Sequence, residues 1–159
     1  MKTKHMVVAA LLVALAILIP NFSFMLLIPT FSATFASHVP IMIAMFVTPW
    51  VGLLVGAGSM LGFILKGVSL DIVMRAAMHM PVAVLGAYMV KKKCKIALTV
   101  GVTGIFHALA ETIVITLFTR NFIAALWIVG VGTLIHHCID FAIALVVIVP
   151  LRKQKFLVK

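Results

Sequence analysis

Ionisable side chains are scarce in this sequence, and several stand inside long apolar runs. The 159 residues include only three acids, and two of them, Glu111 and Asp140, lie within such runs. A charged group at the depth of a membrane is energetically costly, so its presence usually serves a function. These residues are therefore the first candidates for a site.

Spacing places most of these residues on common helix faces. Side chains three or four positions apart in a helix point the same way. Three groups in the sequence follow this rule: Asp71, Arg75 and His79; His107 and Glu111; and Thr133, His136 and Asp140, with His137 beside the last group.

The chemistry indicated by this pattern is the binding of a small carboxylate. With a rise of about 1.5 Å per residue, Arg75 should lie roughly 6 Å below the outer membrane boundary, with Glu111 roughly 12 Å below it. A guanidinium can hold a carboxylate through two parallel hydrogen bonds. We expect an outward-opening pocket and predict as substrate-binding residues His38, Arg75, His79, His107, Glu111, Trp127, Thr133, His136 and His137.

Other interpretations of the same residues remain open. Arg75 could form a plain salt bridge with Asp71, and Glu111 could pair with a histidine across the bundle. We expect no metal site, because the adjacent His136 and His137 point to different faces of one helix. We also expect no catalytic residues, since neither Gly-x-Ser-x-Gly nor His-Glu-x-x-His occurs.

Composition indicates the elements that must position these groups. The chain is 65% hydrophobic and only 10% charged, whereas globular domains are near 45–50% and 25%. A membrane helix needs about 20 largely apolar residues, so the length allows about six helices and no soluble domain. We predict an all-α membrane protein forming a single domain over residues 1–159, with six transmembrane helices in one bundle.

The apolar runs and their interruptions place the helices. The stretch 21–37 is apolar but punctuated by Ser, Thr and Pro, so we predict a loop folded back over the protein, and we take the first run as a retained helix. The predicted helices span approximately 6–19, 38–47, 51–65, 71–90, 96–118 and 122–151.

The net charge of +10 comes mostly from three places that flank apolar runs. These are Lys2 and Lys4; Lys91, Lys92, Lys93 and Lys95; and Arg152, Lys153, Lys155 and Lys159. With six spans they all fall on one side, which the positive-inside rule identifies as cytoplasmic. Both termini are therefore predicted to be cytoplasmic, and we expect no nucleic-acid partner.

Several features together resemble a known family. Ala10 and Ala14 form a small-residue pair that lets another helix approach closely, and Ser37-His38-Val39-Pro40 continues through Pro49 and Gly52. With the length, the six spans and the apolar loop, the chain resembles the substrate-binding subunits (S components) of bacterial energy-coupling factor vitamin transporters. The segment from Pro29 to Pro49, with Arg75-Ala76-Ala77-Met78-His79, is most similar to the predicted niacin-specific members.

The resemblance implies transport across a bacterial cytoplasmic membrane without catalysis by this chain. A transmembrane coupling subunit and two ATPase subunits would be its partners, with Ala10 and Ala14 facing the coupling subunit. ATP would be used by those partners, because this chain lacks a Walker A motif and is expected to bind no cofactor itself. Niacin is the expected vitamin, with pantothenate or another precursor as alternatives, and a self-sufficient proton-coupled transporter as the alternative class.

Overall fold

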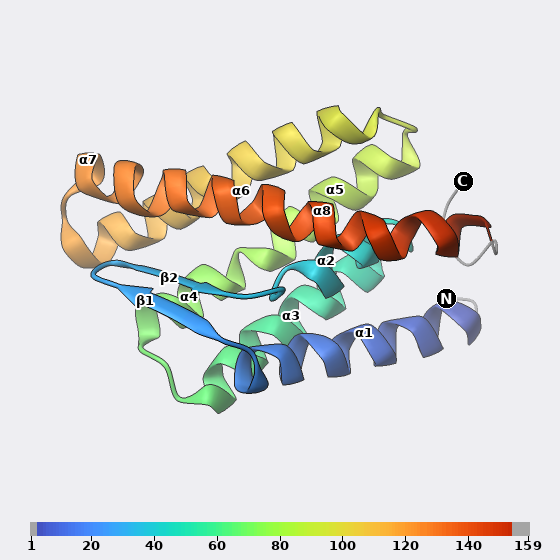
Figure 1. Ribbon diagram of the computed structural model, residues 1–159, viewed down its shortest axis with the longest axis horizontal. Helices are drawn as coiled ribbons and strands as arrows, with labels where there is room; N and C mark the ends of the chain where they lie inside the picture. Colours follow the sequence, from blue (N-terminus) through green and yellow to red (C-terminus); the bar gives the residue numbers. More distant parts are fainter. Residues whose placement is uncertain (1–2, 154–159) are drawn as a thin grey trace.

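The chain folds into a bundle of long helices, described over residues 3–153 by a computed structural model, without the side chains of 152 and 153 (Figure 1). Five helical stretches are long and apolar enough to cross a membrane: 3–22, 49–66, 70–91, 96–119 and 122–151. The long elements are α1 (Thr3–Phe22), α3 (Pro49–Lys66), α4 (Leu70–Ala77), α5 (His79–Lys91), α6 (Ile96–Thr119) and α8 (Val131–Lys153). A multi-pass membrane protein is the class that these lengths support.

The second predicted helix is shorter than expected. Instead of covering residues 38–47, α2 spans Val39–Met45, only seven residues. At 1.5 Å per residue it is about 10 Å long, against a hydrocarbon thickness of about 30 Å. Helix α2 alone therefore cannot cross a membrane, and the second passage along the bundle also uses the extended segment that precedes it.

That extended segment is a β-hairpin, so the prediction of a purely α-helical chain was wrong at this point. Strand β1 (Met25–Ile28) pairs antiparallel with β2 (Phe31–Thr34), and Met25 lies opposite Thr34. Pro29 and Thr30 form the connection, and Thr30 has a φ of 66°. Proline followed by a positive φ is the combination that a type II turn requires.

The hairpin has one buried and one exposed strand. Residues Phe31, Ser32 and Thr34 of β2 are buried, whereas Leu26, Leu27 and Ile28 of β1 are exposed. In Figure 1 the hairpin lies toward the end of the bundle opposite that where α1 begins and α8 ends. Strand β2 thus packs against the helices at this end of the bundle, and β1 lies on the outside.

Several helix boundaries differ from the predicted ones. Pro20 lies inside α1 rather than ending it, and Pro49 begins α3, where the Thr48 hydroxyl caps the helix by accepting a hydrogen bond from the Val51 N–H. The predicted helix 71–90 is divided at Met78 into α4 and α5. The predicted helix 122–151 comprises α7 (Phe122–Ala125), a π-helical turn η1 (Leu126–Gly130) and α8.

Glycines bring the helices of the bundle close together. A Cβ on Gly62 of α3 would lie 2.9 Å from the Ala16 carbonyl oxygen of α1. A Cβ on Gly56 would lie 2.7 Å from backbone atoms of Met80 in α5. Helix α3 therefore contacts α1 and α5 nearly backbone to backbone, as small residues permit in membrane proteins.

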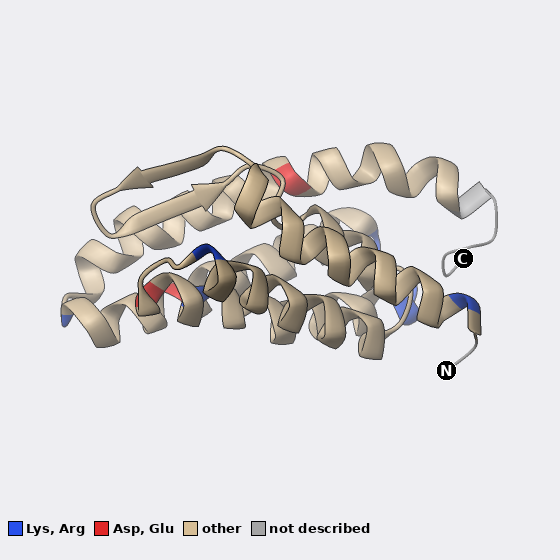
Figure 2. Cartoon of the chain, turned by 90° about the horizontal axis from the view of Figure 1, so that it is seen from below, with Lys and Arg blue, Asp and Glu red and all other residues tan. Residues whose placement is uncertain are grey.

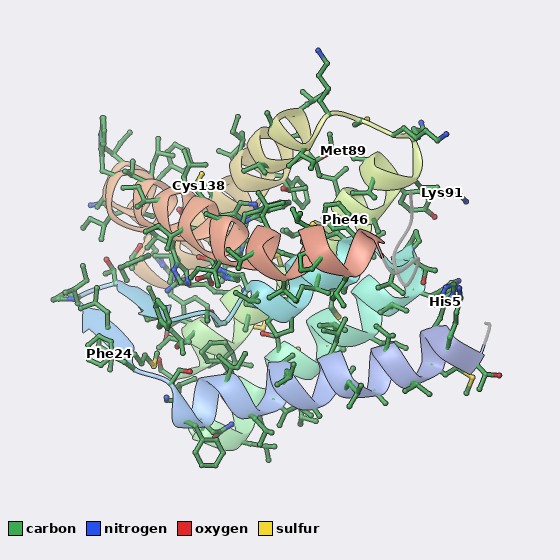
Figure 3. All side chains as sticks on the ribbon, turned by 45° about the vertical axis from the view of Figure 1, so that its right-hand side comes forward. His5, Phe24, Phe46, Met89, Lys91 and Cys138 are labelled. Atoms are coloured by element: carbon green, nitrogen blue, oxygen red, sulfur yellow. The ribbon has the colours of Figure 1, made fainter. Side chains whose placement is uncertain are left out.

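The core divides into an apolar part and a polar part. Phe46 and Phe141 are both 1% exposed and belong to one large apolar cluster with residues of α1, α2, α3, α5 and α8. Figure 3 shows Phe46 directed into the bundle, with His5 and Lys91 near one end and Phe24 near the other. The buried polar residues cluster separately, beneath the hairpin.

The distribution of charge follows the long axis of the bundle. In Figure 2, several basic segments lie toward the end that bears both chain ends, others lie in the opposite half, and the acidic segments lie away from the chain ends. Lys2, Lys155 and Lys159 lie outside the described residues, as do the side chains of Arg152 and Lys153. The described basic residues agree with the asymmetry noted in the sequence.

Candidate functional site beneath the hairpin

Arg75 joins the hairpin to the helices. Its side chain, in the last turn of α4, is 6% exposed. Its Nε and Nη2 donate to Glu111 Oε2 at 3.0 and 2.8 Å. Its Nη1 and Nη2 donate to the Ser32 hydroxyl at 3.0 Å and the Ser32 carbonyl at 3.1 Å. The ion pair of Arg75 is thus made with Glu111, across the bundle, and not with Asp71.

Glu111 is the centre of this polar network. Besides Arg75, its Oε2 accepts a 2.5 Å hydrogen bond from the Thr133 hydroxyl of α8. Its Oε1 lies 3.3 Å from His107 Nε2, one turn earlier in α6. Helices α4, α6 and α8 therefore converge on one buried carboxylate, whose charge is balanced by the guanidinium.

Asp140 holds the segment that follows the hairpin. This fully buried carboxylate of α8 accepts hydrogen bonds from the Ala36 N–H at 3.2 Å and the His38 N–H at 3.0 Å. It also lies 3.2 Å from His38 Nδ1 and 3.4 Å from His136 Nε2. Ala36 has a φ of 62°, so Asp140 fixes a turn with an unusual backbone conformation.

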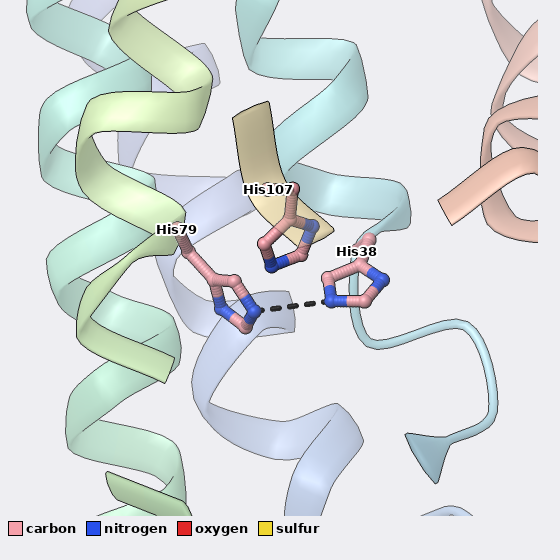
Figure 4. Close-up of side chains that lie close together, drawn as sticks. All are labelled: His38, His79 and His107. Atoms are coloured by element: carbon pink, nitrogen blue, oxygen red, sulfur yellow. Dashed lines mark hydrogen bonds between the residues drawn. The ribbon is translucent and has the colours of Figure 1, made fainter. Parts of the chain in front are cut away.

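Histidines fill the space between these two carboxylates. His38 Nε2 and His79 Nε2 are 3.0 Å apart, and His79 Nδ1 contacts the Ser59 hydroxyl at 2.8 Å. Figure 4 shows His107 directed toward the same point as His38 and His79. Behind it, His107 Nδ1 lies 3.3 Å from His137 Nδ1. The imidazoles come from different elements but form one buried cluster.

A pocket opens beside this cluster, under the inner strand of the hairpin. Its open space is about 20 Å³, room for one or two water molecules, so the pocket is nearly closed in this structure. Arg75 and Glu111 form part of its lining, and Phe63, Ile72 and Ala76 supply apolar surface. The remaining lining residues are Ser32, Ala33, Thr34, Ser37, His38, His79, Thr133 and His136.

The structure brings together most of the residues predicted from the sequence. His38, Arg75, His79, Glu111, Thr133 and His136 line the pocket; His107 packs against His38 and His79, and His137 contacts His107. Trp127 does not join them. It is 71% exposed, because the buried positions of η1 are Val129 and Gly130.

Polar residues at the site that were not predicted from the sequence include Ser32, Thr34 and Asp140. Ser32 and Thr34 lie in a segment predicted to be a loop, and Asp140 was a candidate for the site but was not among the predicted substrate-binding residues. The alternation of Phe31, Ser32, Ala33 and Thr34 was a weak strand signal. Nothing in the local sequence indicated that Asp140 accepts hydrogen bonds from the backbone of residues 36 and 38.

The small-residue pair of α1 points away from the bundle interior. Ala10 and Ala14 are exposed, while Ala9, Leu12 and Ala16 face inward. Ala10 lines an apolar groove between α1 and α3, together with Ala57 and Gly58. The pair is thus accessible to another helix.

Comparison with known proteins identifies the family. No family model matches the chain, and no solved structure matches it. The chain is 38% identical over 164 residues to the niacin transporter NiaX of Lactococcus lactis subsp. cremoris (strain MG1363), covering 91% of this chain and 72% of that protein. Identity at this level over nearly the whole chain shows common descent, and the chain belongs to the NiaX family of energy-coupling factor S components.

Proposed function

We propose that this chain binds nicotinate beneath its hairpin and delivers it to the cytoplasm as part of an ATP-driven transporter. The observation that carries the proposal is the buried Arg75 guanidinium in the wall of a narrow pocket beneath the hairpin. The relative that is named a niacin transporter supports the choice of vitamin.

Arg75 offers its Nη1 edge to a ligand carboxylate. Glu111 occupies Nε and Nη2, and Ser32 accepts from Nη1 and Nη2. These four hydrogen bonds leave one N–H of Nη1 for a ligand. The pyridine ring would then contact the apolar lining at Phe63 and Ile72 and the imidazoles beside them.

Uptake requires partners in this proposal. The sequence has no Walker A motif, so energy would come from two ATPase subunits through a transmembrane coupling subunit. The exposed Ala10 and Ala14 are the surface at which the coupling subunit would approach. No step in this mechanism requires catalysis by the chain itself.

The chain would cross a bacterial cytoplasmic membrane six times, with both termini in the cytoplasm. The second crossing would combine β2 with the short helix α2. The basic residues of α1 and of the loop after α5 support this orientation, by the positive-inside rule. The hairpin and the pocket would then face the outside.

Binding and uptake measured separately test the proposal. The purified chain should bind nicotinate more tightly than nicotinamide or pantothenate in calorimetric titrations. Vesicles containing only this chain should bind nicotinate but fail to accumulate it, and addition of the coupling and ATPase subunits with ATP should restore uptake. Accumulation by the chain alone under a proton gradient would instead identify a secondary transporter using the buried histidines and carboxylates.

A further inference from the structure

Three buried histidines from distant parts of the chain converge on one point. His38 precedes α2, His79 begins α5 and His107 lies in α6. They are 5%, 3% and 1% exposed, and their nitrogen donors lie within 4.8 Å of one another. In the sequence only residues of the last helix suggested metal ligands, and these three histidines were not among them.

The second nitrogen of each ring lies close to another polar side chain. His38 Nδ1 lies 3.2 Å from Asp140, His79 Nδ1 lies 2.8 Å from the Ser59 hydroxyl, and His107 Nδ1 lies 3.3 Å from His137. Metal-binding histidines typically use their second nitrogen in this way, and a carboxylate is a common partner. The arrangement leaves the Nε2 atoms directed toward the shared centre (Figure 4).

A proton shared between two of the imidazoles would account for only part of this geometry. It explains the 3.0 Å contact between the Nε2 atoms of His38 and His79. It does not explain why His107 approaches both, with ring centroids 4.9 and 5.2 Å away. Glu111 Oε1, which lies 3.3 Å from His107 Nε2, adds an oxygen donor on the same side.

The buried charges also favour a cation. With neutral histidines, Arg75 contributes +1 and Glu111 and Asp140 contribute −2, giving −1 for these buried groups. A bound monocarboxylate would lower the sum to −2, which is costly in a buried site. A divalent cation would bring it to zero.

We propose that His38, His79 and His107 form a binding site for a divalent transition-metal cation, with Glu111 Oε1 adjacent as a fourth donor. Three imidazoles and one oxygen suit Zn²⁺ and related ions better than Mg²⁺ or Ca²⁺. Tetrahedral zinc requires donors about 3.3 Å apart, so binding shortens the longest separation between the nitrogens by up to about 1.5 Å. The pocket, which reaches His38 and His79, provides the route of entry.

The test uses the tag-free purified chain, stripped of metal by a chelator and without vitamin. Titration with Zn²⁺ should give one ion bound per chain, and Co²⁺ should give the intense visible bands of a four-coordinate site. His79→Gln and His107→Gln should each weaken Zn²⁺ binding by at least about 100-fold. Ser59→Ala, which removes only the support of His79, should weaken it by about 10- to 100-fold. His5→Gln, near the end of the bundle opposite the hairpin, is the matched control and should leave Zn²⁺ affinity unchanged.

Two results would overturn the proposal. One is the absence of stoichiometric Zn²⁺ binding by the unmodified chain, a measurement that does not depend on the folding of any variant. The other is loss of binding in His136→Gln but not in His107→Gln, which would place the ion at His38, His136 and Asp140 instead. Because no vitamin is present, neither result bears on nicotinate binding.

Discussion

The ion pair between Arg75 and Glu111 allows carboxylate recognition to be separated from stability. Replacement of Arg75 by Met removes the proposed anchor but also leaves Glu111 buried, with only Thr133 and His107 as partners. The double replacement Arg75→Met with Glu111→Gln removes both charges and keeps side chains of similar size. Both variants lack the guanidinium, but only the single variant carries an uncompensated buried charge.

The expected magnitudes follow from the burial of the pair. Breaking a buried ion pair by removing one partner costs roughly 3–5 kcal/mol, whereas replacing both partners is often nearly neutral. We therefore expect the single variant to be strongly destabilised and the double variant to recover most of that loss. Loss of a buried, hydrogen-bonded charge contact to a ligand costs about 2–5 kcal/mol, or roughly 30-fold to several thousand-fold in affinity. Both variants should lose nicotinate affinity by this factor.

Thermal unfolding in detergent and calorimetric titration with nicotinate and nicotinamide would measure the two effects. The unmodified chain should prefer nicotinate, and the double variant should bind both ligands weakly and alike. Arg75→Lys should recover only part of the preference, because an ammonium lacks the planar fork of a guanidinium. A folded double variant that still preferred nicotinate would refute the assignment of Arg75 as the carboxylate anchor.

Three further predictions concern Asp140, the small-residue pair of α1 and the close contact between α1 and α3. Asp140→Ala leaves the Ala36 and His38 N–H groups without their acceptor, at about 1–3 kcal/mol each, so hydrogen exchange there should accelerate; unchanged protection would contradict this role of Asp140. Ala10→Leu should impair co-purification with the coupling subunit but leave nicotinate affinity unchanged, and the opposite pattern would show that α1 uses another face. Gly62→Val should destabilise the fold because its Cβ would meet α1 at 2.9 Å, whereas Gly101→Ala, with nothing within 4 Å, should be tolerated in the same thermal assay.

Local spacing predicted the groups that lie on one helix. His107 and Glu111, four residues apart, do contact each other at 3.3 Å, and His136 lies 3.4 Å from Asp140. The long apolar runs likewise predicted the five long helical stretches to within a few residues. These features depend on helix periodicity and hydropathy, both of which a single sequence records directly.

Helix periodicity and hydropathy did not predict contacts between residues of different elements. Spacing offered Asp71 as the partner of Arg75, but the structure pairs Arg75 with Glu111, 36 residues away. The hairpin was missed because strands of four residues leave too short a pattern to separate from a loop. The exposure of Trp127 depends on the π-helical turn, which shifts the helix face and has no clear signal in the sequence.

Ser32 links the proposed ligand contact to the position of the hairpin. Its hydroxyl accepts a hydrogen bond from Arg75 Nη1, the edge that we assign to the nicotinate carboxylate. A hydroxyl also donates, so it can donate to one carboxylate oxygen while Arg75 donates to the other. The ligand would then bridge Arg75 and the buried strand β2 and strengthen the attachment of the hairpin. Because a ligand favours a conformation only by its higher affinity for it, this bridge is the contact through which nicotinate would favour the conformation seen here, with β2 against the helices.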